Sequence, residues 1–195
     1  MNPLRKIGLF GGSFDPIHHG HLILAREALE SLGLDRVIFI PNGISPHKLE
    51  RPPAPADLRC RMVEAAVRDE EGFDWDDCEI HRPGPSFAID TVREMAARHP
   101  GAGLFFFIGE DNLASLHTWK DIDLLRTLVS FIVMSRGRGL MDREFPVVSK
   151  PVDISSTEIR NRIARGLSVR YLVPESACEI ISQYRLYRGD HSGAT

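Results

Sequence analysis

The sequence lacks the cysteine patterns and long apolar runs that define several protein classes. Its three cysteines, Cys60, Cys78 and Cys178, are far apart and form no CxxC pair. Scattered cysteines in an odd number favour reduced thiols over a disulfide framework or a zinc site, and therefore a cytoplasmic protein. The longest purely apolar run, residues 104–108, is too short to cross a bilayer. The first six residues, MNPLRK, also lack the apolar region of a secretory signal.

A strong charge of either sign is absent too. The formal net charge is -3 and the isoelectric point is near 6.2, which gives no general attraction to a nucleic-acid backbone. With 43% hydrophobic and 26% charged residues and no internal repeat, the composition fits one globular domain. We expect that domain over residues 1–188, with 189–195 as a disordered tail. We expect no nucleic-acid partner and no membrane partner.

Predicted strands and predicted helices alternate along the chain. Short, mainly apolar runs predict strands at 7–10, 36–41, 75–80, 104–109 and 128–135. Apolar residues at helical spacing predict helices at 22–32, 58–67, 87–99, 156–166 and 174–184. Strands that alternate with amphipathic helices are typical of a parallel sheet covered on both faces. The sequence therefore predicts an α/β fold with a doubly wound parallel sheet.

Glycines and histidines gather directly after the first predicted strand, in the segment GGSFDPIHHGH at residues 11–21. Ligands of open α/β sheets bind where a strand passes into a helix, and the free N–H groups of a helix start favour an anion. His18 and His21 are three residues apart, so both can project from one side of the first helical turn. His19 is expected to be a solvent-exposed spacer.

Three interpretations of this segment compete: a surface loop, a metal site and a phosphate site. A zinc site needs a third and a fourth ligand, and no cysteine pair or second histidine cluster supplies them. The dinucleotide pattern GxGxxG and the P-loop pattern GxxxxGK[ST] are both absent from the segment. The glycines, which allow close backbone approach, favour the phosphate site.

Two motifs resemble the signatures of a known superfamily. GSFDPIHHGH is similar to the GxFDPxHxGH signature of the HxGH-motif nucleotidyltransferases, and ISSTEIR at 154–160 is similar to their second signature, ISSTxIR. Within that superfamily, the segments at 41–48, 82–91 and 109–120 resemble those of the nicotinate-nucleotide adenylyltransferases, and the likeness extends over roughly residues 6–188. The resemblance implies a Rossmann-like nucleotidyltransferase fold. It also implies transfer of the adenylyl group of ATP to nicotinate mononucleotide, a step of NAD biosynthesis that releases pyrophosphate.

The resemblance also implies roles for particular residues. Such transfers are catalysed by positioning and by charge stabilisation, and the implied catalytic set is His18, His21, Lys48 and Arg160. The implied ATP-binding residues are Gly11, Ser13, Phe14, His18, His21, Gly109, Ser155, Ser156, Thr157 and Arg160. The implied mononucleotide-binding residues are Asn42, Lys48, Ser86, Phe87, Ala88, Asp111 and Trp119, with Trp119 stacked on the nicotinate ring. Mg²⁺ is expected to accompany ATP and to be held by phosphates and water rather than by a protein metal site.

Several of these residues also have a purely structural interpretation. The ISSTEIR segment is a capping-box pattern that starts a helix, and Lys48 alone reads as a solvated loop lysine. For Asp15 we favour a role in holding the tight turn over a role as general base. Asp111 can cap the helix after its strand or contact a ribose hydroxyl. Arg136, which follows the fifth predicted strand, is a weaker candidate for the nucleotide site.

The chain departs from its relatives at one place. Where they commonly have Ser-Tyr-Thr, it has Ser86, Phe87 and Ala88, and so lacks two hydroxyls. We expect backbone N–H groups to read the nicotinate carboxylate there, so that little changes. Phosphopantetheine adenylyltransferases are one alternative, because they share both signatures. They usually have Thr at the place of His18, however, and lack an equivalent of the segment LHTWK at 116–120. A non-catalytic nucleotide-binding module is the other alternative, and the sequence leaves a homo-oligomer open.

Overall fold

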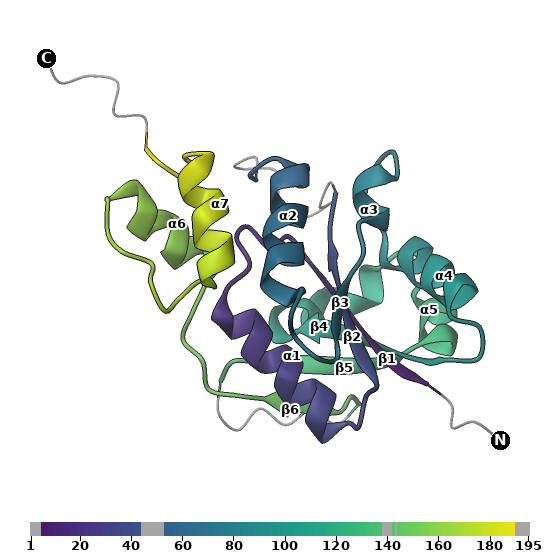
Figure 1. Ribbon diagram of the computed structural model, residues 1–195. Helices are drawn as coiled ribbons and strands as arrows, with labels where there is room; N and C mark the ends of the chain where they lie inside the picture. The colour runs from purple at the N-terminus through teal and green to yellow at the C-terminus, as the bar shows by residue number, and fades with distance from the viewer. Residues whose placement is uncertain (1–4, 44–52, 138–141, 143, 190–195) are drawn as a thin grey trace, which may run out of the picture.

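The computed structural model describes residues 5–43, 53–137, 142 and 144–189 (Figure 1). The expected tail at 189–195 therefore falls almost wholly outside the described residues. Its centre is a sheet of six parallel strands in the order β3-β2-β1-β4-β5-β6. The strands are β1 (Lys6–Gly12), β2 (Arg36–Pro41), β3 (Phe73–Trp75), β4 (Gly103–Gly109), β5 (Ser130–Ser135) and β6 (Val147–Ser149). The predicted doubly wound parallel sheet is confirmed.

Helices cover both faces of this sheet. They are α1 (His19–Ser31), α2 (Ala56–Val67), α3 (Cys78–His81), α4 (Ala88–Arg98), α5 (Ile122–Leu128), α6 (Ser156–Ala164) and α7 (Glu175–Gln183), and a 3-10 helix, η1 (Glu110–Thr118), follows β4. In Figure 1, α1, α2 and α7 lie on one side of the sheet, and α4 and α5 lie on the other. Of the helices that the structure describes, none is long and apolar enough to span a membrane.

The central strands are mainly apolar because their two faces are buried in two different cores. Along β2, Val37 and Phe39 pack into the core under α1, α2 and α7, whereas Ile38 and Ile40 pack into the core under α4 and α5. Alternate residues of a strand point to opposite faces, so a strand covered on both sides has no polar face. The apolar runs of the sequence are explained by this double burial.

Three expectations about the elements were wrong. The run 75–80 is not a strand: the strand ends at Trp75, and a short helix begins at Cys78 after Asp76 accepts the Cys78 N–H at 2.9 Å. An aspartate that bonds the backbone two residues ahead favours a turn over a strand. The first helix begins at His19 rather than at 22, and the strand expected at 128–135 begins at Ser130 because Leu128 still belongs to α5.

Candidate active site

A cavity lies where the strand order reverses. The connections from β1 and from β4 lead to opposite sides, and the carboxyl ends of these two strands border a cleft of about 320 Å³. Its walls come from the strand ends and from the start of α4 and the segment after η1. They include Gly11, Gly12, Ser13, Asn42, Glu79, Ser86, Phe87, Ala88, Gly109, Asp111, Asn112, Trp119 and Lys120. Doubly wound sheets bind their ligands at this switch point.

The two histidines stand together at the start of α1. His18 is the residue before the helix, and its N–H donates to Nδ1 of His21 at 3.2 Å. The two rings are stacked with centroids 3.7 Å apart. Because Nδ1 of a neutral His21 accepts this bond, the ring proton is on Nε2. The bond therefore fixes the tautomer of His21 and leaves Nε2–H as a donor.

His18 is held as a neutral ring. It is fully buried, and neither ring nitrogen has a hydrogen-bond partner among the described residues. Burial, together with the positive charges of Arg136 and His19, lowers the pKa of His18 from its ordinary value of 6.5 to about 3. Buried polar atoms without a partner are rare in folded proteins, and a catalytic role is one of the reasons for which they occur. His19 itself is half-buried, and its N–H donates to the Leu172 carbonyl at 2.9 Å, so the expectation of a solvent-exposed spacer is only partly met.

Glycines make room for these side chains. A Cβ at Gly20 would lie 3.0 Å from Nδ1 and Cε1 of His18, which is closer than ordinary contact. A Cβ at Gly109 would lie 2.3 Å from Oδ1 of Asp111. A side chain at Gly20, in the HHGH segment, or at Gly109, which ends β4, would therefore collide with a neighbouring side chain, and glycine avoids this collision. Asp111 does not cap η1; its carboxylate accepts from Nδ2 of Asn112 at 3.1 Å and lines the cleft.

The ISSTEIR segment forms the start of α6, beside the turn that precedes α1. Ser155 caps the helix by accepting the Glu158 N–H at 3.1 Å, and the Ser156 hydroxyl donates to the Pro16 carbonyl at 3.0 Å. Arg160 donates to the Asp15 carbonyl at 2.8 Å and to the Thr157 hydroxyl at 3.1 Å. The structural interpretation as a helix cap is thus correct. The same contacts bring two distant motifs together.

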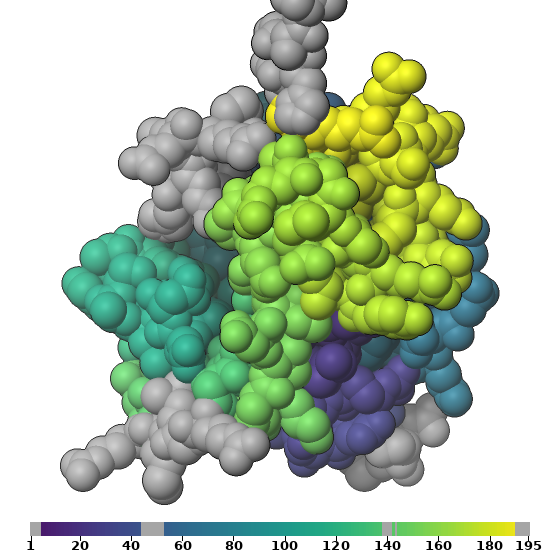
Figure 2. Space-filling view, turned by 90° about the vertical axis from the view of Figure 1, so that its left-hand side faces the viewer, coloured from purple at the N-terminus to yellow at the C-terminus, as the bar shows by residue number. Residues whose placement is uncertain are grey.

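Figure 2 shows α6, in yellow-green, at the centre of one face of the molecule, beside α7 and its yellow continuation. Arg160 lines a smaller cavity of about 200 Å³ rather than the main cleft, together with Asp15, Tyr187 and Arg188. The Asp15 carboxylate accepts from the Ala54 N–H at 3.0 Å and from the Tyr187 hydroxyl at 2.7 Å. These bonds join segments that are distant in the chain, whereas the structural interpretation expected this side chain to hold the local tight turn.

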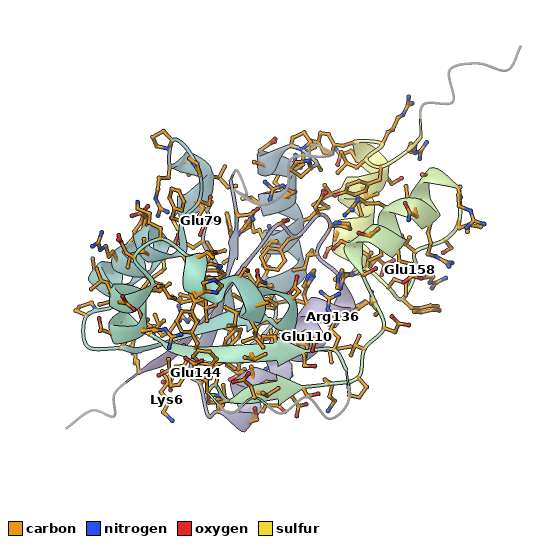
Figure 3. All side chains as sticks on the ribbon, turned by 180° about the vertical axis from the view of Figure 1, so that it is seen from behind. Lys6, Glu79, Glu110, Arg136, Glu144 and Glu158 are labelled. Atoms are coloured by element: carbon orange, nitrogen blue, oxygen red, sulfur yellow. The ribbon has the colours of Figure 1, made fainter. Side chains whose placement is uncertain are left out.

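The other predicted residues are placed as follows. Phe14 is buried, with its ring 5.1 Å from that of His21, so it supports the histidine from the core. Arg136 is exposed and donates to the Ile154 carbonyl at 3.0 Å. In Figure 3 it lies between the sheet and α6, close to Glu110. Lys48 lies outside the described residues.

Ser86, Phe87 and Ala88 form the wall of the cleft at the start of α4. Phe87 precedes the helix, and among the described residues no side chain caps it. Ser86 accepts the Gly43 N–H at 3.1 Å, which ties this wall to the loop after β2. Across the cleft, Trp119 is half-buried, packs edge-on against Phe106 and Phe131, and has a buried Nε1 without a partner in the described part of the chain.

Two buried charged residues near the cleft were missed in the sequence. Glu79 is 6% exposed, lines the cleft and accepts the Thr91 hydroxyl at 2.6 Å, and burial raises its pKa. Arg59 is 1% exposed and lies on α2. In the sequence, Arg59 falls three and four residues before Met62 and Val63, on the apolar face of its helix, and this misplaced charge was a signal that could have been used.

Within the described residues, no group of three or more His, Cys, Asp or Glu side chains could hold a metal ion by itself. All three cysteines are free.

Comparisons with known proteins agree with this architecture. Residues 9–162 match the family described as cytidylyltransferase-like. A probable nicotinate-nucleotide adenylyltransferase of Rubrobacter xylanophilus is 43% identical over 199 residues, covering 95% of this chain and 93% of its own. One of the same name from Thermus thermophilus is 44% identical, covering 94% of this chain and 100% of its own. The solved structure of Plasmodium falciparum nicotinic acid mononucleotide adenylyltransferase complexed with NaAD has the same fold, with a TM-score of 0.76, 20% identity and coverage of 94% and 97%.

Proposed function

Because the chain belongs to the cytidylyltransferase-like family, and within it to the nicotinate-nucleotide adenylyltransferases, we propose that it adenylylates nicotinate mononucleotide. An oxygen of the mononucleotide 5′-phosphate bonds to the α-phosphorus of ATP, and the bond to the bridging oxygen breaks and releases pyrophosphate. The product, nicotinate adenine dinucleotide, places the reaction in NAD biosynthesis. The observation that carries the proposal is the stacked His18–His21 pair at the start of α1. The pair does not line the cleft itself; it follows the loop after β1, whose residues Gly11, Gly12 and Ser13 do.

The attacking phosphate is already a nucleophile, so the protein has to position it and stabilise charge. We assign this work first to the two histidines. His18, whose pKa is lowered to about 3, acts as a neutral donor at the phosphates rather than as a cation. His21 donates through Nε2, since Nδ1 accepts the His18 N–H. Donors fixed before the reaction lose no energy to reorganisation as charge develops.

The remaining ATP contacts are assigned to groups around this pair. The backbone of Gly11 and Ser13 can approach the nucleotide closely, and the first turn of α6 offers N–H groups at its start. Arg160 provides a guanidinium for the β- and γ-phosphates, and the family resemblance assigns a further cation to Lys48. Mg²⁺ would be held by the phosphates and water, and when bound it neutralises phosphate charge. The histidines and Arg160 are suited to bind phosphate, which is consistent with this arrangement.

The mononucleotide is assigned to the other wall of the cleft. The nicotinate ring stacks on Trp119, and its carboxylate takes N–H groups at the start of α4, where Phe87 and Ala88 stand. Asn42 and Ser86 line the same pocket. Asp111 lies just after the end of β4, where its carboxylate can accept a hydrogen bond from a ribose hydroxyl. The lost hydroxyls of Phe87 and Ala88 leave this backbone recognition in place.

The test is pyrophosphate release from Mg-ATP with one acceptor at a time: nicotinate mononucleotide, nicotinamide mononucleotide or phosphopantetheine. We expect release with the first and much less with the second. Release only with phosphopantetheine would change the substrate, and release with none would favour a binding module. We also infer a cytoplasmic location, supported by the three free cysteines. The elution volume of the pure protein determines whether it is a homo-oligomer.

A further inference from the structure

A fully buried arginine stands behind the cleft. Arg59 is 1% exposed and, among the fully buried side chains described, is the largest. Its Nε donates to the Ala54 carbonyl at 3.1 Å, and one terminal nitrogen donates to the Ser13 carbonyl at 2.6 Å. The other terminal nitrogen donates to the carbonyls of Asn42 at 2.7 Å and Gly43 at 3.4 Å. All the hydrogen bonds described for this side chain go to backbone carbonyls.

Two of these carbonyls belong to the segments that follow β1 and β2, to which the proposed function assigns the two substrates. Ser13 follows β1, on the side assigned to ATP, and Asn42 follows β2, on the side assigned to the mononucleotide; both line the cleft. Gly43 also donates its N–H to the Ser86 hydroxyl, so the connection extends to the start of α4. One guanidinium thus joins both walls of the site.

The chemistry of this contact is specific to arginine. Burying a cation that meets carbonyls and no paired carboxylate is costly, and desolvation accordingly lowers the pKa of Arg59. Asp15 is the opposite charge that acts on it most. An apolar side chain would fill the same space at lower cost. The guanidinium instead offers several donors in one rigid plane, which lysine cannot reproduce.

We propose that Arg59 is a positioning residue that sets the distance between the ATP loop after β1 and the mononucleotide loop after β2, so that the acceptor phosphate lies in line with the α-phosphorus. The inference rests on the proposed function. The proposal implies that each substrate can still bind when the Arg59 guanidinium is removed, but that the two substrates are then misaligned. Alignment errors of about 1 Å cost on the order of 10²-fold in rate.

The test compares Arg59→Lys with Arg61→Lys, a matched change on the same helix at an exposed arginine that bonds the Tyr184 hydroxyl. We expect Arg59→Lys to lower the single-turnover rate roughly 10- to 100-fold, while the Kd of each substrate alone changes by about twofold or less. The control should keep the wild-type rate. An Arg59→Lys protein with the wild-type rate, or with weakened Kd values at an unchanged rate, overturns the proposal.

A second variant separates positioning from folding. In Arg59→Ala, added guanidinium at a non-denaturing concentration should restore part of the lost rate, and ethylammonium should not, because only the planar ion reproduces the fork. Equal effects of the two ions refute the proposal. If both Arg59 variants melt below the assay temperature, the residue serves stability and the proposal is rejected. A wild-type protein that forms no dinucleotide removes the proposed function, whereas an active wild type with unaffected variants removes this inference alone.

Discussion

Replacing Gly20 by alanine should damage catalysis while sparing the fold. The new Cβ would lie 3.0 Å from the His18 ring, and ordinary contact begins near 3.4 Å, so the ring has to yield by about 0.4 Å. Val152, 3.4 Å from the same Cβ, and the stacked ring of His21 limit where it can go. If a misplacement of 1 Å costs about 10²-fold, a shift of this size lowers kcat roughly 5- to 10-fold.

Stability should change little in the same variant. Overpacking costs about 1–3 kcal/mol, and alanine in place of glycine within α1 returns about 1 kcal/mol of helix propensity. The measurements are the single-turnover rate and the urea midpoint of unfolding. Gly103→Ala is the matched control, because a Cβ there meets its nearest neighbour at an ordinary 3.7 Å, at the far end of β4. A folded Gly20→Ala protein with the wild-type rate would refute the argument that the position of the His18 ring governs the reaction.

Further predictions concern individual side chains of the site. His18→Ala should lower kcat by roughly 10²-fold, against little change for His19→Ala in the same assay. The pKa of His18 is about 3 in the folded protein, against an ordinary value of 6.5, so between these pH values only the unfolded state binds the proton. The free energy of unfolding should therefore fall as the pH drops below 6.5. Denaturant titrations should show this decrease, and a smaller one in His18→Asn. Arg160→Ala should raise the KM for ATP far more than that for the mononucleotide, with partial rescue by Arg160→Lys; a loss confined to the mononucleotide would move Arg160 out of the ATP site. Trp119→Ala should lower kcat/KM for the nicotinate and nicotinamide mononucleotides alike, whereas wild type should prefer the acid by roughly 5- to 150-fold, as expected for about 1–3 kcal/mol of unpaired polar contact. If that preference appeared only in Ala88→Thr, side-chain hydroxyls rather than backbone N–H groups would read the carboxylate.

The sequence was most informative where burial is two-sided. β1, β2, β4 and β5 were predicted because their residues are apolar on both faces. β6 has three residues at the edge of the sheet, too few for a periodic signal, and η1 is mostly polar. Neither was predicted. At 75–80 the local bonding of Asp76 outweighed the expectation of a strand.

The candidate site divides in the same way. His18, His21 and the start of α6 lie in contiguous motifs whose spacing fixes their geometry on a helix. The contacts of Glu79 and Arg59 involve residues outside their own helices. The carbonyls that accept from Arg59 follow β1 and β2, and no local sequence pattern predicts these partners. Their burial is decided by the packing of α2 and α3 against those loops, which only the folded chain displays.

The reversal of strand order also divides the sheet along a seam. β1 to β3 and their helices are continuous in the chain, as are β4 to β6, and the two blocks meet only along the edge between β1 and β4 within the sheet. The groups assigned to ATP come from both blocks, since α1 belongs to one and α6 to the other. The mononucleotide pocket likewise joins the start of α4 to Trp119. On the proposed assignments, either substrate would contact both sides of this seam. Its binding would raise the free energy of unfolding by RT ln(1 + [L]/Kd), about 2.7 kcal/mol at a hundredfold excess over Kd. Without either substrate, the free energy of unfolding of this protein would be at its lowest.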